Sequence, residues 1–183
     1  MIEVRNLFVK LGDKQIFHDF NAEFPDEGTV LVSGESGIGK TTLLRVICGL
    51  QKPDVGFVTG IKERRISVVF QEPRLLEHLS AIDNVAVVSD KKRAEDLMLR
   101  LNLGNELHLK AGALSGGQKQ RVSIARAFAF SDDVVLLDEP FTGLDEQNKK
   151  RVADLIHTAR LAIIVTHVPS DVELLNIDRK ITL

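Results

Sequence analysis

A glycine-rich stretch between an apolar strand pattern and a helical pattern constrains this chain more than any other feature. The residues TVLVSG at 29–34 have the character of a short buried strand, KTTLLRVICGL at 40–50 has helical spacing, and GESGIGKT at 34–41 joins the two. This is the complete P-loop pattern, in which glycines let successive backbone N–H groups turn towards a phosphate. The strand before it and the helix after it supply the context that the pattern requires. The sequence therefore predicts a nucleotide-binding domain of the α/β class.

The P-loop pattern assigns a task to each of its polar residues. Lys40 is expected to reach the terminal phosphates, Thr41 to place its hydroxyl on Mg²⁺, and the helix start to add the positive end of its dipole. We expect ATP with Mg²⁺ to be bound by the following residues: Gly34, Glu35, Ser36, Gly37, Ile38, Gly39, Lys40, Thr41 and Thr42.

A second apolar strand pattern, VVLLDE at 134–139, ends in two acidic residues. Ligands of open α/β sheets bind at the carboxyl ends of the strands, so this is the expected edge for the site. We expect Asp138 to hold Mg²⁺ through water and Glu139 to polarise the water that attacks the γ-phosphate. The alternative is that the two acids only cap the next helix.

Apolar strands that alternate with helices indicate a mostly parallel sheet flanked by helices. Residues 2–32 alternate apolar and polar and predict an N-terminal antiparallel β subdomain, and residues 56–70 indicate strand, turn and strand. An amphipathic helix is expected in KKRAEDLMLRLNLG at 91–104, closed by Gly104. The 183 residues suit one domain, 1–183, with a short inserted helical subdomain at about 72–112.

Composition limits the classes of partner. With 24 basic and 26 acidic residues the net charge is −2, which gives no broad attraction for nucleic acid. Cys48 is the only cysteine and excludes an internal disulfide. Neither a secretory signal pattern nor an apolar run of about 20 residues is present. We therefore expect a cytoplasmic location, with any membrane role exerted through a partner.

A second glycine turn, ALSGGQKQRVSIARAFAF at 113–130, opens another helical pattern. Ser115 followed by Gln118 fits a capping box, in which side chains satisfy the first free N–H groups of a helix. That interpretation leaves Gly116 and Gly117 unexplained, because each glycine weakens a first turn by about 1 kcal/mol relative to alanine. Glycines there are expected where another group approaches the backbone closely.

The five residues 114–118, LSGGQ, resemble the signature of ATP-binding cassette (ABC) ATPases, and further motifs of this family follow the same order along the chain. The resemblance implies that Gln71 contacts Mg²⁺ and water, that His167 contacts the γ-phosphate, and that Thr142–Asp145 lies across a dimer seam. It also implies a second ABC ATPase subunit, identical or different, packed head to tail. Each ATP would then lie between one P-loop and the partner's Ser115, Gly116, Gly117 and Gln118.

Residues 70–85, FQEPRLLEHLSAIDNV, resemble the corresponding segment of importer ATPases for nitrate, sulfonates and related solutes. That resemblance implies docking to an integral membrane transport subunit, with Arg74, Leu75 and Leu76 as candidates, and a possible solute-binding protein beyond it. The implied function is ATP hydrolysis that powers solute transport. The alternatives are an ATP-gated regulator of a membrane complex and a soluble ABC ATPase.

One departure from the family concerns the base. The family commonly stacks an aromatic residue on adenine, whereas this chain has neither Tyr nor Trp, and Leu11 occupies the expected position. Phe8 and Phe17 are the aromatic alternatives.

Overall fold

Two β-sheets organise the chain, and the computed structural model describes all of residues 1–183. The strands are β1 (Ile2–Leu11), β2 (Lys14–Phe24), β3 (Gly28–Ser33), β4 (Val55–Thr59), β5 (Ile66–Val69), β6 (Val134–Asp138), β7 (Leu161–Val165) and β8 (Arg179–Thr182). The helices are α1 (Lys40–Ile47), α2 (Ala81–Ala86), α3 (Lys91–Arg100), α4 (Gly116–Phe130), α5 (Glu146–Ile156) and α6 (Pro169–Glu173). Two short 3₁₀ helices cover Gly104–Glu106 and Ala111–Ala113.

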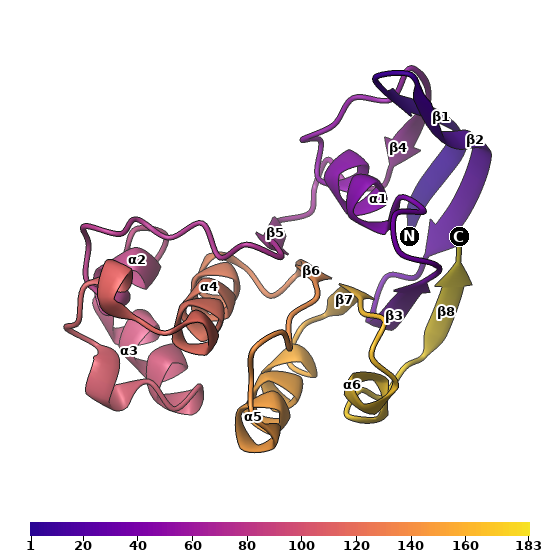
Figure 1. Cartoon of the computed structure of the whole chain (residues 1–183). Helices are drawn as coiled ribbons and strands as arrows, with labels where there is room; N and C mark the ends of the chain where they lie inside the picture. Colours follow the sequence, from indigo (N-terminus) through magenta and orange to yellow (C-terminus); the bar gives the residue numbers. More distant parts are fainter.

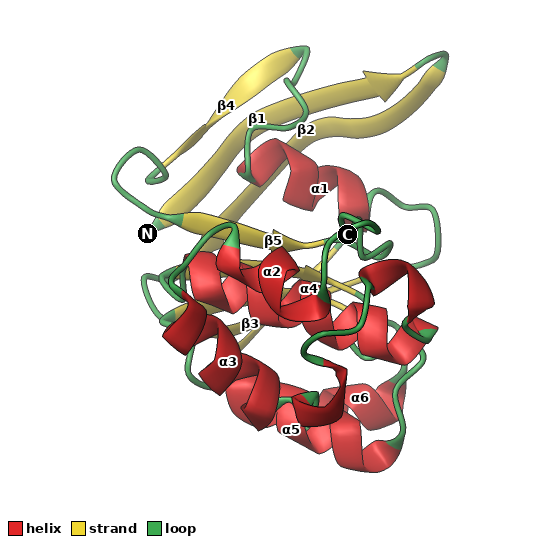
Figure 2. Ribbon diagram, turned by 90° about the vertical axis from the view of Figure 1, so that its left-hand side faces the viewer, coloured by secondary structure: helices red, strands yellow, loops and turns green.

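The larger sheet is parallel throughout, with the strand order β5-β6-β7-β3-β8. Both faces of its central strands are buried, so successive residues of β6 point into different cores: Val134 and Leu136 into one, Val135 and Leu137 into the other. The period of two along a strand explains why these segments are uniformly apolar in sequence. Helix α1 covers one face beneath the β1–β2 hairpin, while α4 and α5 cover the other (Figures 1 and 2). The predicted fold class, a P-loop type α/β domain with an antiparallel β subdomain, is confirmed.

The smaller sheet is antiparallel, with the order β2-β1-β4. The sequence indicated strand, turn and strand for residues 56–70, but the two strands lie in different sheets. β4 pairs with β1 and exposes alternate residues, with Phe57 55% exposed, whereas β5 pairs in parallel with β6 and buries Ser67 and Val69. Only six residues thus separate β4, which is buried on one face, from β5, which belongs to the central sheet.

Helix α3 ends earlier than the sequence suggested. We expected Gly104 to close it, but the residue in the left-handed region is Asn102, with φ 56°. The N–H of Leu103 donates to the carbonyl of Met98, and the N–H of Asn102 donates to that of Leu99, which is the Schellman arrangement. Asparagine tolerates this conformation better than most residues, so it competes with glycine as a helix terminator.

Helices α2 and α3 pack against α4 and lie with it at one end of the molecule, away from the β1–β2 hairpin (Figure 1). They fall within residues 72–112, whose role as a separate helical subdomain stays a prediction. None of the helices combines the length and apolar character needed to cross a membrane.

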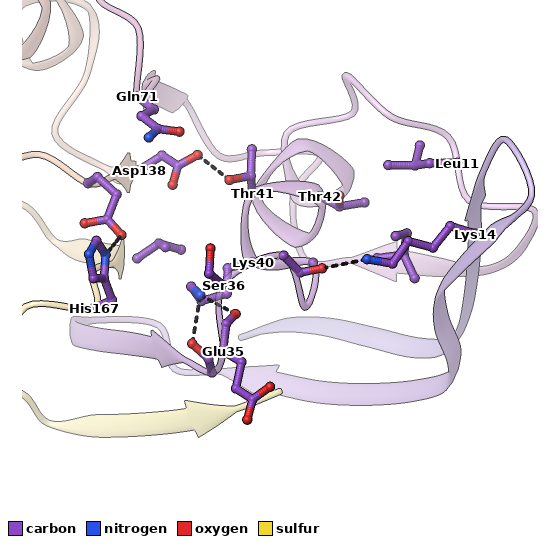
Figure 3. A pocket seen from close by; sticks show the side chains of 16 residues that line it. Leu11, Lys14, Glu35, Ser36, Lys40, Thr41, Thr42, Gln71, Asp138 and His167 are labelled. Atoms are coloured by element: carbon purple, nitrogen blue, oxygen red, sulfur yellow. Dashed lines mark hydrogen bonds and ion pairs between the residues drawn. The ribbon is translucent and has the colours of Figure 1, made fainter.

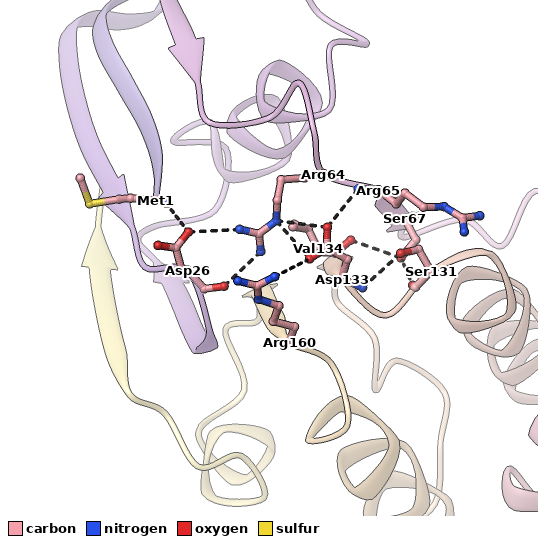
Figure 4. Close-up of polar contacts among 9 residues, drawn as sticks. All are labelled: Met1, Asp26, Arg64, Arg65, Ser67, Ser131, Asp133, Val134 and Arg160. Carbon is pink, nitrogen blue, oxygen red and sulfur yellow. Dashed lines mark hydrogen bonds and ion pairs between the residues drawn. The ribbon is translucent and has the colours of Figure 1, made fainter.

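The edge of the parallel sheet where its strands begin is tied together by a charged network (Figure 4). Arg64, in the segment between β4 and β5, has a side chain only 11% exposed, and its Nε donates to Asp133 at 3.1 Å. Its other nitrogens donate to the carboxylate and carbonyl of Asp26 at 3.2 and 3.1 Å, and Asp26 also pairs with the N-terminal ammonium of Met1. Arg160 lies 3.8 Å from Asp133. Arg64 therefore links the antiparallel sheet to the start of β6.

Replacing Arg64 with methionine keeps a long side chain with an apolar stem but removes the guanidinium and its hydrogen bonds. We expect the free energy of unfolding, measured by urea denaturation, to fall by about 1–3 kcal/mol, because hydrogen bonds to charged groups are of this size. Lys62→Met, at an exposed position in the same connecting segment, is the control. Equal stability of the two variants would show that the network does not stabilise the fold.

Candidate functional site

The P-loop runs from the end of β3 to the first residue of α1, as the sequence predicts. Gly39 has a φ of 122°, and a Cβ placed on it would lie 2.6 Å from Cγ2 of Ile16 and 3.1 Å from Cζ of Phe17. A side chain there would meet both strain and a clash with β2. The glycine therefore allows the loop to pack directly against the neighbouring hairpin and fixes where α1 begins.

Lys40 is buried at the centre of this loop. Its ammonium donates to the backbone carbonyls of Gly34 and Glu35, both at 2.8 Å (Figure 3). These carbonyls compensate the buried charge. Because the partners are neutral, phosphate oxygens can compete for the same ammonium through stronger charge-assisted hydrogen bonds.

Asp138, at the end of β6, meets the first turn of α1. The hydroxyl of Thr41 donates to Oδ2 of Asp138 at 2.7 Å, and the aspartate is only 4% exposed. Burial raises the pKa of Asp138 above its usual value, since the ionised form loses water, while the Thr41 hydrogen bond opposes that shift. The carboxylate forms no ion pair, so a cation at this position would be favoured electrostatically.

The oxygens of Thr41 and Asp138 also fit Mg²⁺ by type. Mg²⁺ in proteins takes hydroxyl, water and one or two carboxylate ligands together with substrate phosphates. The chain has no group of three or more His, Cys, Asp and Glu side chains suited to hold a metal by themselves. This donor set therefore fits a cation that shares its coordination with a bound phosphate.

Glu139 and His167 lie together at the next position along the same sheet edge. Nδ1 of His167 is 2.6 Å from Oε1 of Glu139; the histidine side chain is 72% exposed and that of the glutamate 12%. Glu139 has a φ of 50°, a strained conformation for a residue other than glycine that costs of order 1–3 kcal/mol, and its N–H donates to the carbonyl of Val165 at 2.9 Å. The backbone bond to β7 supports this conformation beside His167.

These groups surround one cavity of about 670 Å³ at the carboxyl ends of the parallel strands. Six residues predicted from the sequence to act on the phosphates or the metal line it: Lys40, Thr41, Gln71, Asp138, Glu139 and His167. Of the loop residues expected to bind ATP, Gly34, Glu35, Ser36, Gly37, Gly39 and Thr42 also line it, whereas Ile38 does not. Their individual roles stay predictions.

The other end of the cavity is formed by the β1–β2 hairpin. Leu11 and Ile16 line it, while neither aromatic alternative does: Phe17 is buried, and Phe8 packs edge-on against His18 with 4.9 Å between ring centroids. Lys14 also lines the cavity, and its Nζ donates to the carbonyl of Gly37 at 3.2 Å (Figure 3). Sequence reasoning missed Lys14, because nothing in the pattern of β2 shows that this residue faces the P-loop.

The second glycine turn does not line this cavity. Ser115 accepts from the N–H of Gln118 at 3.3 Å and the Gln118 side chain accepts from the N–H of Ser115 at 2.8 Å, so the predicted capping box is confirmed. A Cβ on Gly117 would lie 2.5 Å from the carbonyl oxygen of Gly143, whereas one on Gly116 would meet nothing within 4 Å. The close approach at Gly117 thus comes from within the chain, and Gly116 faces open space.

Of the three residues expected at a docking surface, only Leu76 is exposed and apolar, while both its backbone groups bond the side chain of Asn84. Leu75 packs against the larger core. Arg74 is exposed, and its guanidinium lies over the ring of Phe70.

The sequence pattern of a known family, the ABC transporter family, matches residues 17–142. The sulfate/thiosulfate import ATP-binding protein CysA of Synechocystis sp. is 36% identical over 191 residues, covering 91% of this chain and 53% of the relative. The aliphatic sulfonates import ATP-binding protein SsuB 1 of Paracoccus denitrificans is 34% identical over 175 residues, covering 91% of this chain and 72% of the relative. The chain thus spans about half the length of its CysA relatives.

Solved structures resemble the whole chain. A dimeric structure of MJ0796, a bacterial ABC transporter cassette, superposes with a TM-score of 0.88 at 28% identity and covers 100% of this chain and 94% of the other. A dimeric post-hydrolysis state of MJ0796 bound to ADP and Pi gives a TM-score of 0.87 at 27% identity with the same coverage.

Replacing Asp138 with asparagine keeps an oxygen that can accept from Thr41 but removes the charge. We expect the nucleotide-free variant to be more stable than the wild type at neutral pH, because burial raises the pKa of Asp138 and so disfavours its ionised form in the folded state. That cost is absent below the unfolded-state pKa of aspartate and grows as the pH rises through the folded-state pKa. The gain should therefore shrink in mildly acidic buffer, measured by urea denaturation at both pH values. Asp154→Asn, exposed on α5, is the control, and a gain independent of pH would contradict the assignment.

Proposed function

Because this chain belongs to the ABC transporter family, we propose that it is an ATP-binding and ATP-hydrolysing subunit that powers solute transport. One observation carries the proposal: the ends of β3, β5, β6 and β7 bring the P-loop, Gln71, Asp138, Glu139 and His167 to a single cavity. This is the edge of a parallel sheet where ligands bind. The import proteins among its relatives favour uptake over export.

At one end of the cavity, backbone N–H groups and charged side chains would bind the phosphates. The N-terminus of α1 directs its free N–H groups and its positive dipole end to the phosphates. Lys40 would exchange its two carbonyl partners for oxygens of the terminal phosphates. Thr41 and Asp138 would hold Mg²⁺ with Gln71 nearby. Mg²⁺, when bound, supplies positive charge that stabilises negative charge developing on the phosphates.

Glu139 would act as the general base on the attacking water. Its carboxylate is nearly buried, lies beside the metal position at Asp138 and is oriented by His167. A positioned base contributes about 10²–10⁴-fold in rate. The exposed side of His167 remains available for the γ-phosphate, so one histidine would contact both the base and the substrate.

The signature turn would complete the site of a second ABC ATPase subunit. Ser115 and Gly116 are exposed, and residues 115–118 do not line the cavity of their own subunit. The exposed start of α4 at Gly116 is therefore available to phosphate brought by a partner. The related cassettes described as dimeric support such an assembly.

The proposal that the chain works at a membrane rests on its family and on the resemblance of residues 70–85 to importer ATPases. An integral membrane subunit would dock beside Leu76, place the chain on the cytoplasmic face of the membrane, and receive cargo from a solute-binding protein. An ATP-gated regulator of a membrane complex is the second candidate, because it would use the same cavity. Co-purification distinguishes the two: a membrane-spanning partner that moves a solute supports transport, and one that moves none supports regulation.

Replacing Glu139 with glutamine keeps its shape but removes the proposed base. We expect ATP affinity within about twofold of the wild type and steady-state hydrolysis lower by about 10²–10⁴-fold. Phosphate release and equilibrium binding measure the two quantities separately. Glu95→Gln, exposed on α3, is the matched control. Undiminished hydrolysis by the Glu139 variant would remove this residue from catalysis.

Replacing Ser115 with arginine places a long charged side chain on the exposed signature turn. We expect the isolated subunit to bind ATP normally, because residue 115 does not line its cavity. In a Glu139→Gln background, where slow hydrolysis should preserve bound ATP and so an ATP-dependent dimer, we expect Ser115→Arg to abolish that dimer. Light scattering with and without ATP measures the dimer. Asn176→Arg, in the exposed loop between α6 and β8, introduces the same charge as a control. A dimer of normal strength in the Ser115 variant would refute the cross-subunit role.

A further inference from the structure

The segment that follows Gln71 is held in place by a side chain of α4. Nη2 of Arg126 donates to the carbonyls of Pro73 and Arg74 at 3.0 and 3.1 Å, and Nη1 donates to Arg74 at 3.2 Å. Arg126 is half-buried and forms no ion pair, so these carbonyls are its hydrogen-bond partners. Separating the segment from α4 would leave a partly desolvated cation without partners, which is costly.

The same segment is bent by a second arginine. Arg74 has a φ of 46°, in the left-handed region, and its guanidinium lies 4.4 Å from the centroid of the Phe70 ring. Residues on both sides of Gln71 are thereby held against each other. A non-glycine residue persists in this conformation only where its surroundings support it, and the carbonyl of Arg74 accepts two hydrogen bonds from Arg126. The segment that follows Gln71 is thereby joined to α4.

The N-terminal end of α4 is equally well anchored. Arg121 is buried and donates to two carbonyls at the end of α3, at 2.7 and 2.9 Å, and to Oδ1 of Asn148 in the first turn of α5 at 3.0 Å. Asn148 in turn bonds Asp145, and Gly117 lies against Gly143. The signature turn and the Thr142–Asp145 loop therefore form one packed unit with α4. Gly117 and Arg126 are about 13 Å apart along the helix axis.

We propose that Arg126 is a positioning residue that places Gln71 at the cavity and couples its displacement to the signature turn. The proposal rests on the proposed function, because it assumes that Gln71 responds to a nucleotide bound in its own subunit. A shift of Gln71 then moves Pro73 and Arg74, which displace α4 through the guanidinium. The helix carries that displacement to residues 115–117, which face the other nucleotide. Arg126 does not line the cavity, so it would act on the nucleotide only through Gln71 and α4.

The clamp itself is tested without any nucleotide. We expect Arg126→Met to accelerate amide hydrogen exchange in residues 71–76 of the nucleotide-free protein, while the far strands β1 and β2 stay unchanged. Arg126→Lys, which can donate to the same carbonyls without the planar fork, should show a smaller acceleration and guards against misfolding of the methionine variant. Arg100→Met, at an exposed position in the last turn of α3, is the control. Unchanged exchange in residues 71–76 of both Arg126 variants would overturn the proposal.

The functional consequence is tested by a double-mutant cycle with Gln71→Ala. We expect Arg126→Met to lower kcat by about ten- to a hundred-fold with KM for ATP changed less than about threefold, because displacement of a positioned group has effects of this size. In the Gln71→Ala background, Arg126→Met should lower kcat further by less than about twofold. Additive losses would show that Arg126 does not act through Gln71. Absence of hydrolysis in the wild type would instead count against the proposed function, and the exchange result then decides the clamp alone.

Discussion

Parallel pairing of β3, β6 and β7 is the constraint on which the rest of the structure depends. Because both faces of these strands are buried, their interior residues are almost all apolar, and most polar groups lie where the strands stop. Parallel direction places all those ends at one edge. The hydrogen bond between Thr41 and Asp138 then joins the start of α1 to the end of β6. The cavity is thus a consequence of topology, and its chemistry comes from polar residues at or just after the strand ends.

Helix α4 connects this edge of the sheet to a surface of the molecule that faces outwards. Its N-terminal turn is exposed at Gly116 yet closely packed at Gly117. Of the two, only Gly117 has a close contact within the chain that requires glycine. Two arginines on the same helix bond to backbone carbonyls of other segments, Arg121 to the end of α3 and Arg126 to the segment after Gln71. A guanidinium has several donors in a fixed plane, so it can hold carbonyls of two residues at once. The helix is therefore linked to both the cavity-lining segment and the outward-facing turn.

The sequence was sufficient for features that depend on local pattern. Strand and helix types, the P-loop, the acidic end of β6 and the capping box at Ser115 all follow from spacing and residue chemistry. Features that depend on which segments meet were not accessible. Neither the division of β4 and β5 between two sheets nor the approach of Lys14 to Gly37 leaves a trace in the local pattern. Asn102 ended α3 before Gly104 because two residue types can adopt the same left-handed conformation.

The two ends of the cavity differ in how they can recognise a ligand. Leu11, which is 43% exposed, and Ile16 offer apolar contact area at the hairpin end, and the one donor beside them, Lys14, already bonds the carbonyl of Gly37. The opposite end offers Lys40, the N-terminus of α1 and the pair of Glu139 and His167, all of which respond to charge. A ligand shifts an equilibrium only through contacts that differ between two states. If the cavity takes ATP as proposed, a change in the number of phosphates alters more of the polar contacts with this chain than a change of the base does.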